Sequence, residues 1–243
     1  MKSRHIYTLI LAAIFISFGC SSSGRIGNQI TDDQIIIVDK GGNQSISVSK
    51  GKAFDHPTIA IWAEDSQGNY LETIYVTNSY ASGIYSFEMV GDTSWLSNPG
   101  PSYQPAALPY WTHKKGLIKG KTLIPTVENP FVDAYSGPTP VGNFTIKSED
   151  SFGKPFRILL EVNQFGDWNK YWINNKYPNS KAYGHSAQPS VIYSVTITQH
   201  DTVFYLNPIG HGDPEGTSGK LFTDLSTLTT ALEILEQIKV TTK

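Results

Sequence analysis

The sequence predicts an all-β sandwich that carries a single helix near its C-terminus. Short runs of β-branched and aromatic residues recur along the 243-residue chain, and clusters of Gly, Pro, Asn and Asp separate them. Such runs are typical of strands, and the clusters between them are typical of turns. Only 16% of the residues are charged and the formal net charge is -2, so a basic nucleic-acid-binding surface is not expected.

The N-terminus has the pattern of a secretory signal. Two basic residues precede an apolar run from Ile6 to Phe18, which is shorter than a permanent membrane-spanning helix requires. Cys20, the only cysteine, follows Gly19 as it does in bacterial lipoproteins, where the cysteine thiol is acylated and becomes the new N-terminus. The two residues before Gly19 depart from the lipoprotein pattern, so an ordinary signal peptide with a chance cysteine is the alternative.

These features give an expected division of the chain. Residues 1–19 form the signal peptide, residues 20–33 form a lipidated, Ser-rich tether, and residues 34–243 form the folded domain. An acyl-anchored protein lies on a membrane surface and does not span it. We therefore expect a lipid-anchored protein of the bacterial cell envelope that faces the periplasm or the exterior.

Four strands are expected in the first part of the domain. An apolar run at 35–38 is followed by Ser45–Ser49, whose apolar and polar residues alternate as in a half-buried strand. A hairpin comes next, in which strands at 58–63 and 70–77 flank a glycine-containing turn. Trp62 lies among aliphatic residues in this hairpin, so it is expected in the core.

The second half of the domain is expected to contain more strands and the helix. Strands are expected at 142–146 and 155–162, and a second hairpin is expected from 190–198 and 201–206. The helix is expected to end at residue 238 and to begin at a cap formed by Asp224 or Ser226. This helix is predicted because four apolar residues recur at helical spacing: Leu228, Leu232, Leu235 and Ile238.

Two motifs resemble a known bacterial family. The hairpin PTIAIWAEDSQGNYLETIYV, from Pro57 to Val76, and the later segment VDAYSGPTPVGNF, from Val132 to Phe144, occur in this order. Both are similar to the periplasmic family catalogued as domain of unknown function 2271. The resemblance covers residues 57–207. It implies an exported β-sandwich of the immunoglobulin-like type, and it implies no established activity.

Two aromatic segments, at 92–112 and 166–184, are candidates for binding an envelope protein or a small ligand. The first is rich in proline, which excludes central strands, and loops of this length are usually functional or mobile. In the second, flat rings stand beside amide side chains, a combination that suits a sugar or a peptide. The candidate residues are Trp111 in the first segment and Trp168, Tyr171 and Trp172 in the second. The alternative is that these rings fold inward and close one end of the sandwich.

The segment from Asp133 to Thr139, with the sequence DAYSGPT, is a candidate for flavin attachment. It is similar to the acceptor segment of covalently flavinylated bacterial proteins, in which a transferase joins FMN to the final Thr through a phosphoester. The similarity implies Thr139 as the attachment point and Asp133 as the upstream acidic residue. Pro138 stands where that pattern has Ala and restrains the chain, so a tight turn before the strand at Phe144 is the alternative.

Metal binding and catalysis have less support in the sequence. The tightest pair of metal-ligand types is His211 and Asp213, in a glycine-rich loop where both side chains could instead bind backbone groups. Paired cysteines, HExxH, EF-hand and GxSxG motifs do not occur, and nothing selects two carboxylates for glycoside cleavage. An enzyme is therefore not expected.

The expected function is that of a non-enzymatic binding or accessory module of the cell envelope that needs no cofactor. It would engage its partner through the two aromatic segments. The alternative is an extracytoplasmic electron carrier with FMN covalently attached at Thr139.

Overall fold

The computed structural model describes residues 34–37, 43–86, 88–90, 94–96, 98–118, 121–122, 124–131, 136–148 and 152–242. All of them belong to one compact unit, Thr31–Lys243. The expected signal peptide, the tether with Cys20, and Asp133 lie outside the described residues. Within the described part of the chain, no helix is long and apolar enough to cross a bilayer.

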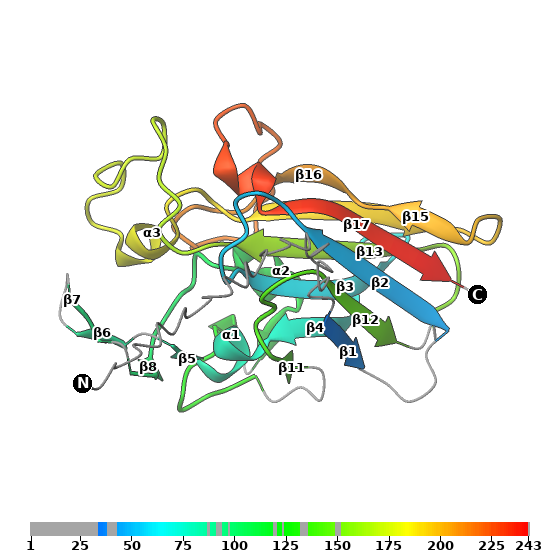
Figure 1. The fold of residues 1–243 in the computed structure, drawn as a ribbon, viewed down its shortest axis with the longest axis horizontal. Helices are drawn as coiled ribbons and strands as arrows, with labels where there is room; N and C mark the ends of the chain where they lie inside the picture. Colours follow the sequence, from blue (N-terminus) through cyan, green and yellow to red (C-terminus); the bar gives the residue numbers. More distant parts are fainter. Residues whose placement is uncertain are drawn as a thin grey trace, which may run out of the picture. The chain divides into compact units, whose positions relative to one another are not determined.

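Two β-sheets packed against each other confirm the all-β sandwich (Figure 1). The first sheet has the strand order β1 (Gln34–Ile37), β12 (Phe144–Ser148), β2 (Gln44–Lys50), β17 (Leu235–Thr242) and β15 (Val203–Tyr205). The second sheet has the order β11 (Ser136–Gly137), β4 (Tyr70–Thr77), β3 (Thr58–Asp65), β13 (Phe156–Asn163), β14 (Val191–Ile197) and β16 (Asn207–His211). In both sheets every pairing is antiparallel except β1 with β12 and β11 with β4.

Short elements connect these strands. Three two-stranded ladders pair β5 (Ile84–Tyr85) with β8 (Gly100–Pro101), β6 (Glu88–Val90) with β7 (Ser94–Leu96), and β9 (Leu117–Ile118) with β10 (Lys121–Thr122). The helices are α1 (Asn78–Ser82), α2 (Pro109–Lys114), α3 (Lys181–Ser186) and the 3-10 turn η1 (Thr230–Glu233).

The main core lies between the two sheets. In β2, residues alternate between buried and half-buried, so Ile46 and Val48 face the core, as the alternating sequence predicts. Ile238 and Val240 of the neighbouring β17 join the same apolar cluster. Ile61 of β3 meets them from the second sheet.

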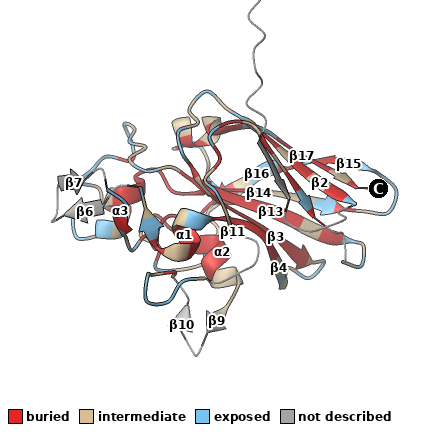
Figure 2. Cartoon of the chain, turned by 60° about the horizontal axis from the view of Figure 1, so that its bottom comes forward, coloured by how far each residue is buried: buried red, intermediate tan, exposed pale blue. Residues whose placement is uncertain are grey.

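The second sheet is covered on both faces. Its outer face carries a second apolar cluster, in which Trp62 of β3 and Leu159 of β13 pack with Tyr80 of α1 and Trp111 of α2. Figure 2 shows α2 beside β3, with most of the helix coloured as buried. Strands that are buried on both faces have continuous apolar runs rather than alternating ones. This explains why six consecutive residues of β3, from residue 59 to residue 64, are buried, and it confirms Trp62 as a core residue.

The first predicted hairpin is confirmed as β3 and β4. The Asp65 carboxylate accepts hydrogen bonds from the backbone N–H groups of Gln67 and Asn69 at 2.9 and 2.8 Å, which fixes the turn. Gly68 has a φ of 83°, a left-handed conformation that favours glycine.

The second predicted hairpin is wrong. Its two segments form β14 and β15, but β14 pairs with β13 and β16 in the second sheet, whereas β15 pairs with β17 in the first. The connection at 198–202 therefore crosses from one sheet to the other. The residue pattern correctly predicted that each segment is a strand, but the strand with which each one pairs depends on contacts between residues that are distant in sequence.

The predicted C-terminal helix is also wrong. The Asp224 carboxylate accepts hydrogen bonds from the N–H and hydroxyl of Ser226, which forms a turn, and the chain then makes η1 and the strand β17. A register shift between Leu235 and Gln237 puts Leu235 and Ile238 on the same face although they are three residues apart. A β-bulge thus imitates helical spacing, while the β-branched residues that follow favour a strand.

The strand assignment predicts that Val240→Ala destabilises the protein by about 2 kcal/mol, because it removes two buried methyl groups and leaves a cavity. Val240 is fully buried and lies beyond the end of the predicted helix. Thermal or urea unfolding measures the change. Thr241→Ala is the matched control, since Thr241 is half-buried on the opposite face and its truncation should change stability by less than about 0.5 kcal/mol. Equal effects of the two variants would contradict a core-facing strand.

Candidate functional site

The second aromatic segment is the best candidate for a binding surface. We call residues 164–180, between β13 and α3, the aromatic loop. Four of its large apolar side chains are exposed: Phe165 (52%), Trp168 (40%), Tyr171 (51%) and Ile173 (45%). The third predicted ring of this segment, Trp172, is buried. The loop therefore combines a buried base with an exposed apolar rim.

Ring contacts connect the buried base to the exposed rim. Tyr183 of α3 lies at the centre, with ring-centre distances of 5.8 Å to Trp168, 6.4 Å to Trp172 and 4.8 Å to Tyr177. Trp172 in turn contacts the ring of Tyr171, edge to face, at 5.1 Å. The structure thus brings together Trp168, Tyr171 and Trp172, as their clustering in the sequence suggested. Offset and edge-on ring pairs of this kind add to the stability gained from burial.

Asn169 fixes the backbone of the aromatic loop. Its amide oxygen accepts hydrogen bonds from the N–H groups of Tyr171 and Trp172 at 2.8 and 2.7 Å. Its amide nitrogen donates to Gln188 Oε1 at 3.0 Å and to the carbonyl oxygen of Thr227 at 2.9 Å. One side chain therefore joins the loop to two other segments, so the exposed rings are held in place rather than carried on an unattached loop.

The C-terminal part of the first aromatic segment is buried. We call residues 104–115, which include α2, the cover segment. Trp111, predicted as a ligand contact, is fully buried there, and its indole N–H donates to Thr73 Oγ1 at 3.0 Å. The rings of Tyr80 and Phe131 pack against Trp111 at 6.0 and 5.4 Å. The alternative, in which the rings fold inward, therefore holds for Tyr110 and Trp111, whereas Tyr103 of the first aromatic segment is 57% exposed.

A buried carboxylate holds the cover segment on the second sheet. Glu161 of β13 is fully buried, and its oxygens accept hydrogen bonds from Tyr110 N at 3.2 Å, Trp111 N at 2.7 Å and Ser190 Oγ at 2.5 Å. The N-cap residue of α2, Leu108, offers no side-chain cap, so Glu161 supplies the acceptors that this helix start needs. Burial raises the pKa of Glu161 from 4.5 to about 7, although these three hydrogen bonds act in the opposite direction.

A second buried carboxylate lies near the other end of α2. Glu64 of β3 accepts hydrogen bonds from the indole of Trp62 at 3.1 Å and from Arg157 at 3.2 Å, and the Lys114 ammonium is 3.7 Å away. Lys114 also donates to the carbonyl oxygen of Gly68 at 2.9 Å. Glu161 thus holds the start of α2 directly, whereas Glu64 is bound by Trp62 and Arg157 and reaches the cover segment through Lys114.

The segment from residue 211 to residue 219 closes over the cover segment. A Cβ atom at Gly212 would lie 2.5 Å from Ser190 Oγ, and one at Gly216 would lie 2.3 Å from the backbone of Pro105. Only glycine allows such close approach at these two positions. Gly212 and Gly216 of this glycine-rich loop are therefore packing positions.

His211 and Asp213, the predicted metal ligands, are both buried. The His211 ring stacks on Phe222 at 5.1 Å, and its Nδ1 hydrogen-bonds to the carbonyl oxygen of Gly212 at 2.8 Å. Burial acts to raise the pKa of Asp213, but hydrogen bonds from the N–H of Glu215 and the hydroxyls of Ser218 and Thr217 outweigh it and lower this pKa. Across the described residues, no group of three or more His, Cys, Asp or Glu is arranged to hold a metal ion.

Thr139, the predicted flavin attachment point, is half-buried at the edge of the second sheet. Its hydroxyl lies 3.4 Å from that of Ser79 in α1, and the Tyr75 hydroxyl donates to the carbonyl oxygen of Pro138 at 2.6 Å. The chain then turns into β12, which begins at Phe144, as expected for the turn alternative.

Comparisons with known proteins do not identify the chain. It matches no family model, no curated protein and no solved structure. The resemblance to domain of unknown function 2271, and the immunoglobulin-like type of sandwich that it implies, therefore stay predictions. Function has to be argued from the side chains themselves.

Sequence reasoning missed several residues of these sites. Phe165 and Ile173 were not singled out, because a lone apolar residue in a loop gives no sign of its exposure. Glu161 follows the apolar run ILL in the sequence RILLEVN. A carboxylate within such a run indicates that the side chain is buried and hydrogen-bonded. Its partners Tyr110 and Trp111 are about 50 residues distant in sequence, which no local pattern could reveal.

We expect Glu161 to make the stability of the protein depend on pH. Because its pKa is raised from 4.5 to about 7 on folding, its contribution is fully present below pH 4.5 and is lost as the pH rises through about 7. At about 1.36 kcal/mol per pKa unit, the loss is on the order of 3 kcal/mol. Urea unfolding at a series of pH values across this window measures it.

The matched variant is Glu161→Gln, which keeps an acceptor oxygen but does not titrate. Other groups also contribute to the pH dependence of stability, and Asp167, whose pKa burial raises, is one of them. They contribute equally to both proteins, so the difference in unfolding free energy between wild type and variant isolates Glu161. A difference that stays constant from pH 4.5 to pH 7 would show that Glu161 does not titrate there.

Proposed function

We propose that this protein is an exported, lipid-anchored, non-enzymatic binding module of the bacterial cell envelope, and that the aromatic loop is its binding surface. The observation that carries the proposal is the exposed rim of Phe165, Trp168, Tyr171 and Ile173 on a loop whose backbone is fixed. Exposed apolar groups gathered in this way often mark an interaction site. The signal and Cys20 support the location.

A buried polar atom next to this rim supports binding further. The indole N–H of Trp172 is buried, and no described residue accepts a hydrogen bond from it. Leaving such a donor unsatisfied is unfavourable by about 1–3 kcal/mol. An oxygen atom brought by a bound partner would remove this penalty, and Tyr171, whose ring contacts that of Trp172, is exposed.

Fixed geometry also favours binding. Residues that are already held in place lose little conformational freedom when a partner binds, so more of the contact energy appears as affinity. The double variant Trp168→Ala/Tyr171→Ala removes the two exposed rings and leaves Asn169 and Trp172 in place. We expect it to weaken binding about tenfold or more, because aromatic side chains that become buried in an interface contribute most of the binding energy.

The partner can be sought without assuming its class. A photo-crosslinking residue such as p-benzoylphenylalanine, placed at Tyr171 in the full chain and activated in the native host, should form adducts that mass spectrometry assigns to lipid, glycan or protein. The same residue at Tyr205 is the matched control, because this ring is equally exposed (49%) on β15. Adducts at both positions alike, or at neither, would contradict a specific surface on the aromatic loop.

The electron-carrier alternative is tested separately. The contacts of Thr139 and Pro138 are those of a turn packed on β4 and α1, and none of them calls for a flavin. For a binding module we expect the protein from its native host to have an acylated mass that starts at Cys20 and no flavin absorbance. A mass increment that follows flavin absorbance and disappears in Thr139→Ala would replace the binding proposal by covalent FMN.

A further inference from the structure

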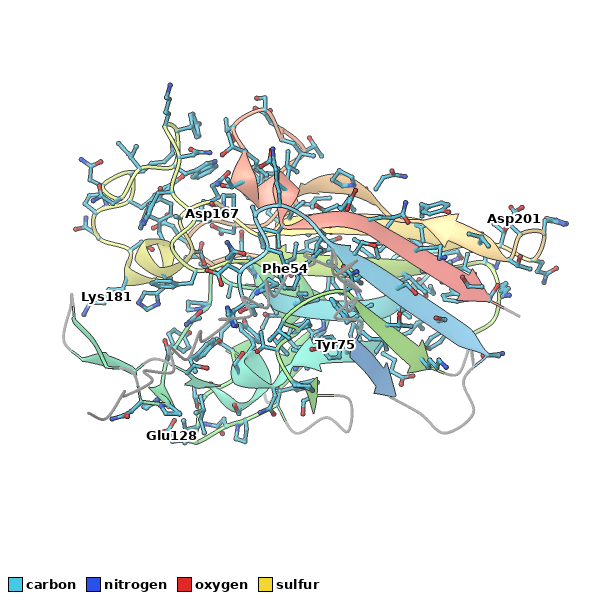
Figure 3. The ribbon with its side chains drawn as sticks, in the orientation of Figure 1. Phe54, Tyr75, Glu128, Asp167, Lys181 and Asp201 are labelled. Carbon is cyan, nitrogen blue, oxygen red and sulfur yellow. The ribbon has the colours of Figure 1, made fainter. Side chains whose placement is uncertain are left out.

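The aromatic loop combines its exposed apolar rim with a local excess of positive charge. Lys170, Lys176 and Lys181 occur within twelve residues, whereas Asp167 is the only acidic residue between positions 162 and 200. Lys170 and Lys181 are exposed, and Figure 3 shows Lys181 at the outer end of the molecule. The whole chain, in contrast, has a net charge of -2.

The one carboxylate within the loop, that of Asp167, is turned inward, whereas Glu215 of the neighbouring segment is half-buried and close enough to help raise the pKa of Tyr177. Asp167 accepts a hydrogen bond from the hydroxyl of Thr230 in η1, and Figure 3 shows it on the side of the loop that adjoins η1. The carboxylate of Asp213, in the neighbouring loop, is bound by Thr217 and Ser218. The surface that the loop presents to solvent therefore combines its exposed apolar side chains with lysines and with the exposed amides of Asn174, Asn175 and Asn179.

The exposed side chains suit a lipid interface better than a sugar. Tyr171 has the Lys176 ammonium 3.4 Å from its ring centre, so a cation occupies one face of the ring and at most one face is open for stacking on a sugar. Phe165 and Ile173 offer no polar group to a glycan. Trp and Tyr are the residues that concentrate at membrane–water interfaces, and lysines beside them attract anionic headgroups.

The frame of the loop allows insertion without rearrangement. Asn169 holds the N–H groups of Tyr171 and Trp172, and the Tyr183 hydroxyl donates to the carbonyl oxygen of Ile173 at 2.7 Å. These backbone groups are satisfied within the protein, so the side chains of Tyr171 and Ile173 can enter an apolar layer without exposing unpaired backbone groups to it.

We propose that the aromatic loop is a membrane-docking surface, which places Phe165, Trp168, Tyr171 and Ile173 in the interface of an anionic bilayer. This inference rests on the proposed binding function and names its partner. The acyl chain at Cys20 would then supply one membrane attachment and the loop a second, and two attachments together also fix the orientation of the domain on the surface.

Tryptophan quenching by brominated lipids tests this directly. The full chain is reconstituted in vesicles of brominated phosphatidylcholine with one quarter phosphatidylglycerol. Residues 1–33 contain no Trp, so the anchor region adds no signal. Trp62, Trp111 and Trp172 are buried in the domain. We expect the bromine atoms to quench the fluorescence of the wild-type protein, and we expect the quenching of Trp168→Phe to be less than half as large. Trp95 is present in both proteins, so its contribution does not affect this comparison.

Two further comparisons define the expected result. Tyr171→Ala/Ile173→Ala should reduce the quenching of Trp168, whereas Val203→Ala/Tyr205→Ala, which changes two exposed residues of β15, should leave it unchanged. Replacing phosphatidylglycerol by phosphatidylcholine should weaken the docking of the loop, measured by this quenching, about fivefold for each lysine that contacts a headgroup. Equal quenching in wild type and Trp168→Phe, or no quenching, would overturn docking, and quenching independent of anionic lipid would overturn the role of the lysines.

The outcomes separate this inference from the function on which it rests. Adducts at position 171 with a protein or a glycan, together with unquenched Trp168, would overturn membrane docking and leave a binding module. No adducts at position 171 and no quenching would overturn both.

Discussion

The hydrogen bonds of Glu161 to the start of α2 determine how the second sheet is built. A six-residue helix without a side-chain cap of its own is not stable alone, and the carboxylate supplies the missing acceptors from the sheet itself. With α2 fixed there, Trp111 and Tyr110 cover the outer face of β3. The central strands can then be apolar on both faces, which is why Trp62 is a core residue although it points away from the first sheet.

The cover segment and the aromatic loop both carry several aromatic rings but differ in the exposure of those rings, and their polar anchors explain the difference. The cover segment is anchored by acceptors on the sheet beneath it, Glu161 and Thr73, so its rings are drawn onto the sheet. The aromatic loop is anchored by its own Asn169, which binds the loop backbone and the ends of two neighbouring segments. Its rings are therefore held at the periphery, where Trp168 and Tyr171 remain exposed. Aromatic content alone does not distinguish these two cases.

Much of the fold could be predicted from local patterns, and the failures have physical causes. Alternation identified β2, and two strand-forming runs around a glycine-containing turn identified the hairpin of β3 and β4. The bulge in β17 spaced Leu235 and Ile238 like residues of a helix. The partners of β14 and β15 are decided by packing between distant segments, which no window of sequence contains. For the site, the clustering of Trp168, Tyr171 and Trp172 in the sequence correctly predicted that they lie close together. It did not predict that Trp172 is buried whereas the other two are exposed.

The position of β17 has a consequence for the order in which the protein can form. β17 lies between β2 and β15 in the first sheet, and Thr242 pairs with Gln44. The first sheet therefore cannot be completed until residues near both limits of the described chain have met, and contacts of such long range form slowly. For a chain that crosses a membrane before it folds, as proposed here, this delay is useful, because a polypeptide without a finished sheet can still be threaded through a narrow translocation channel.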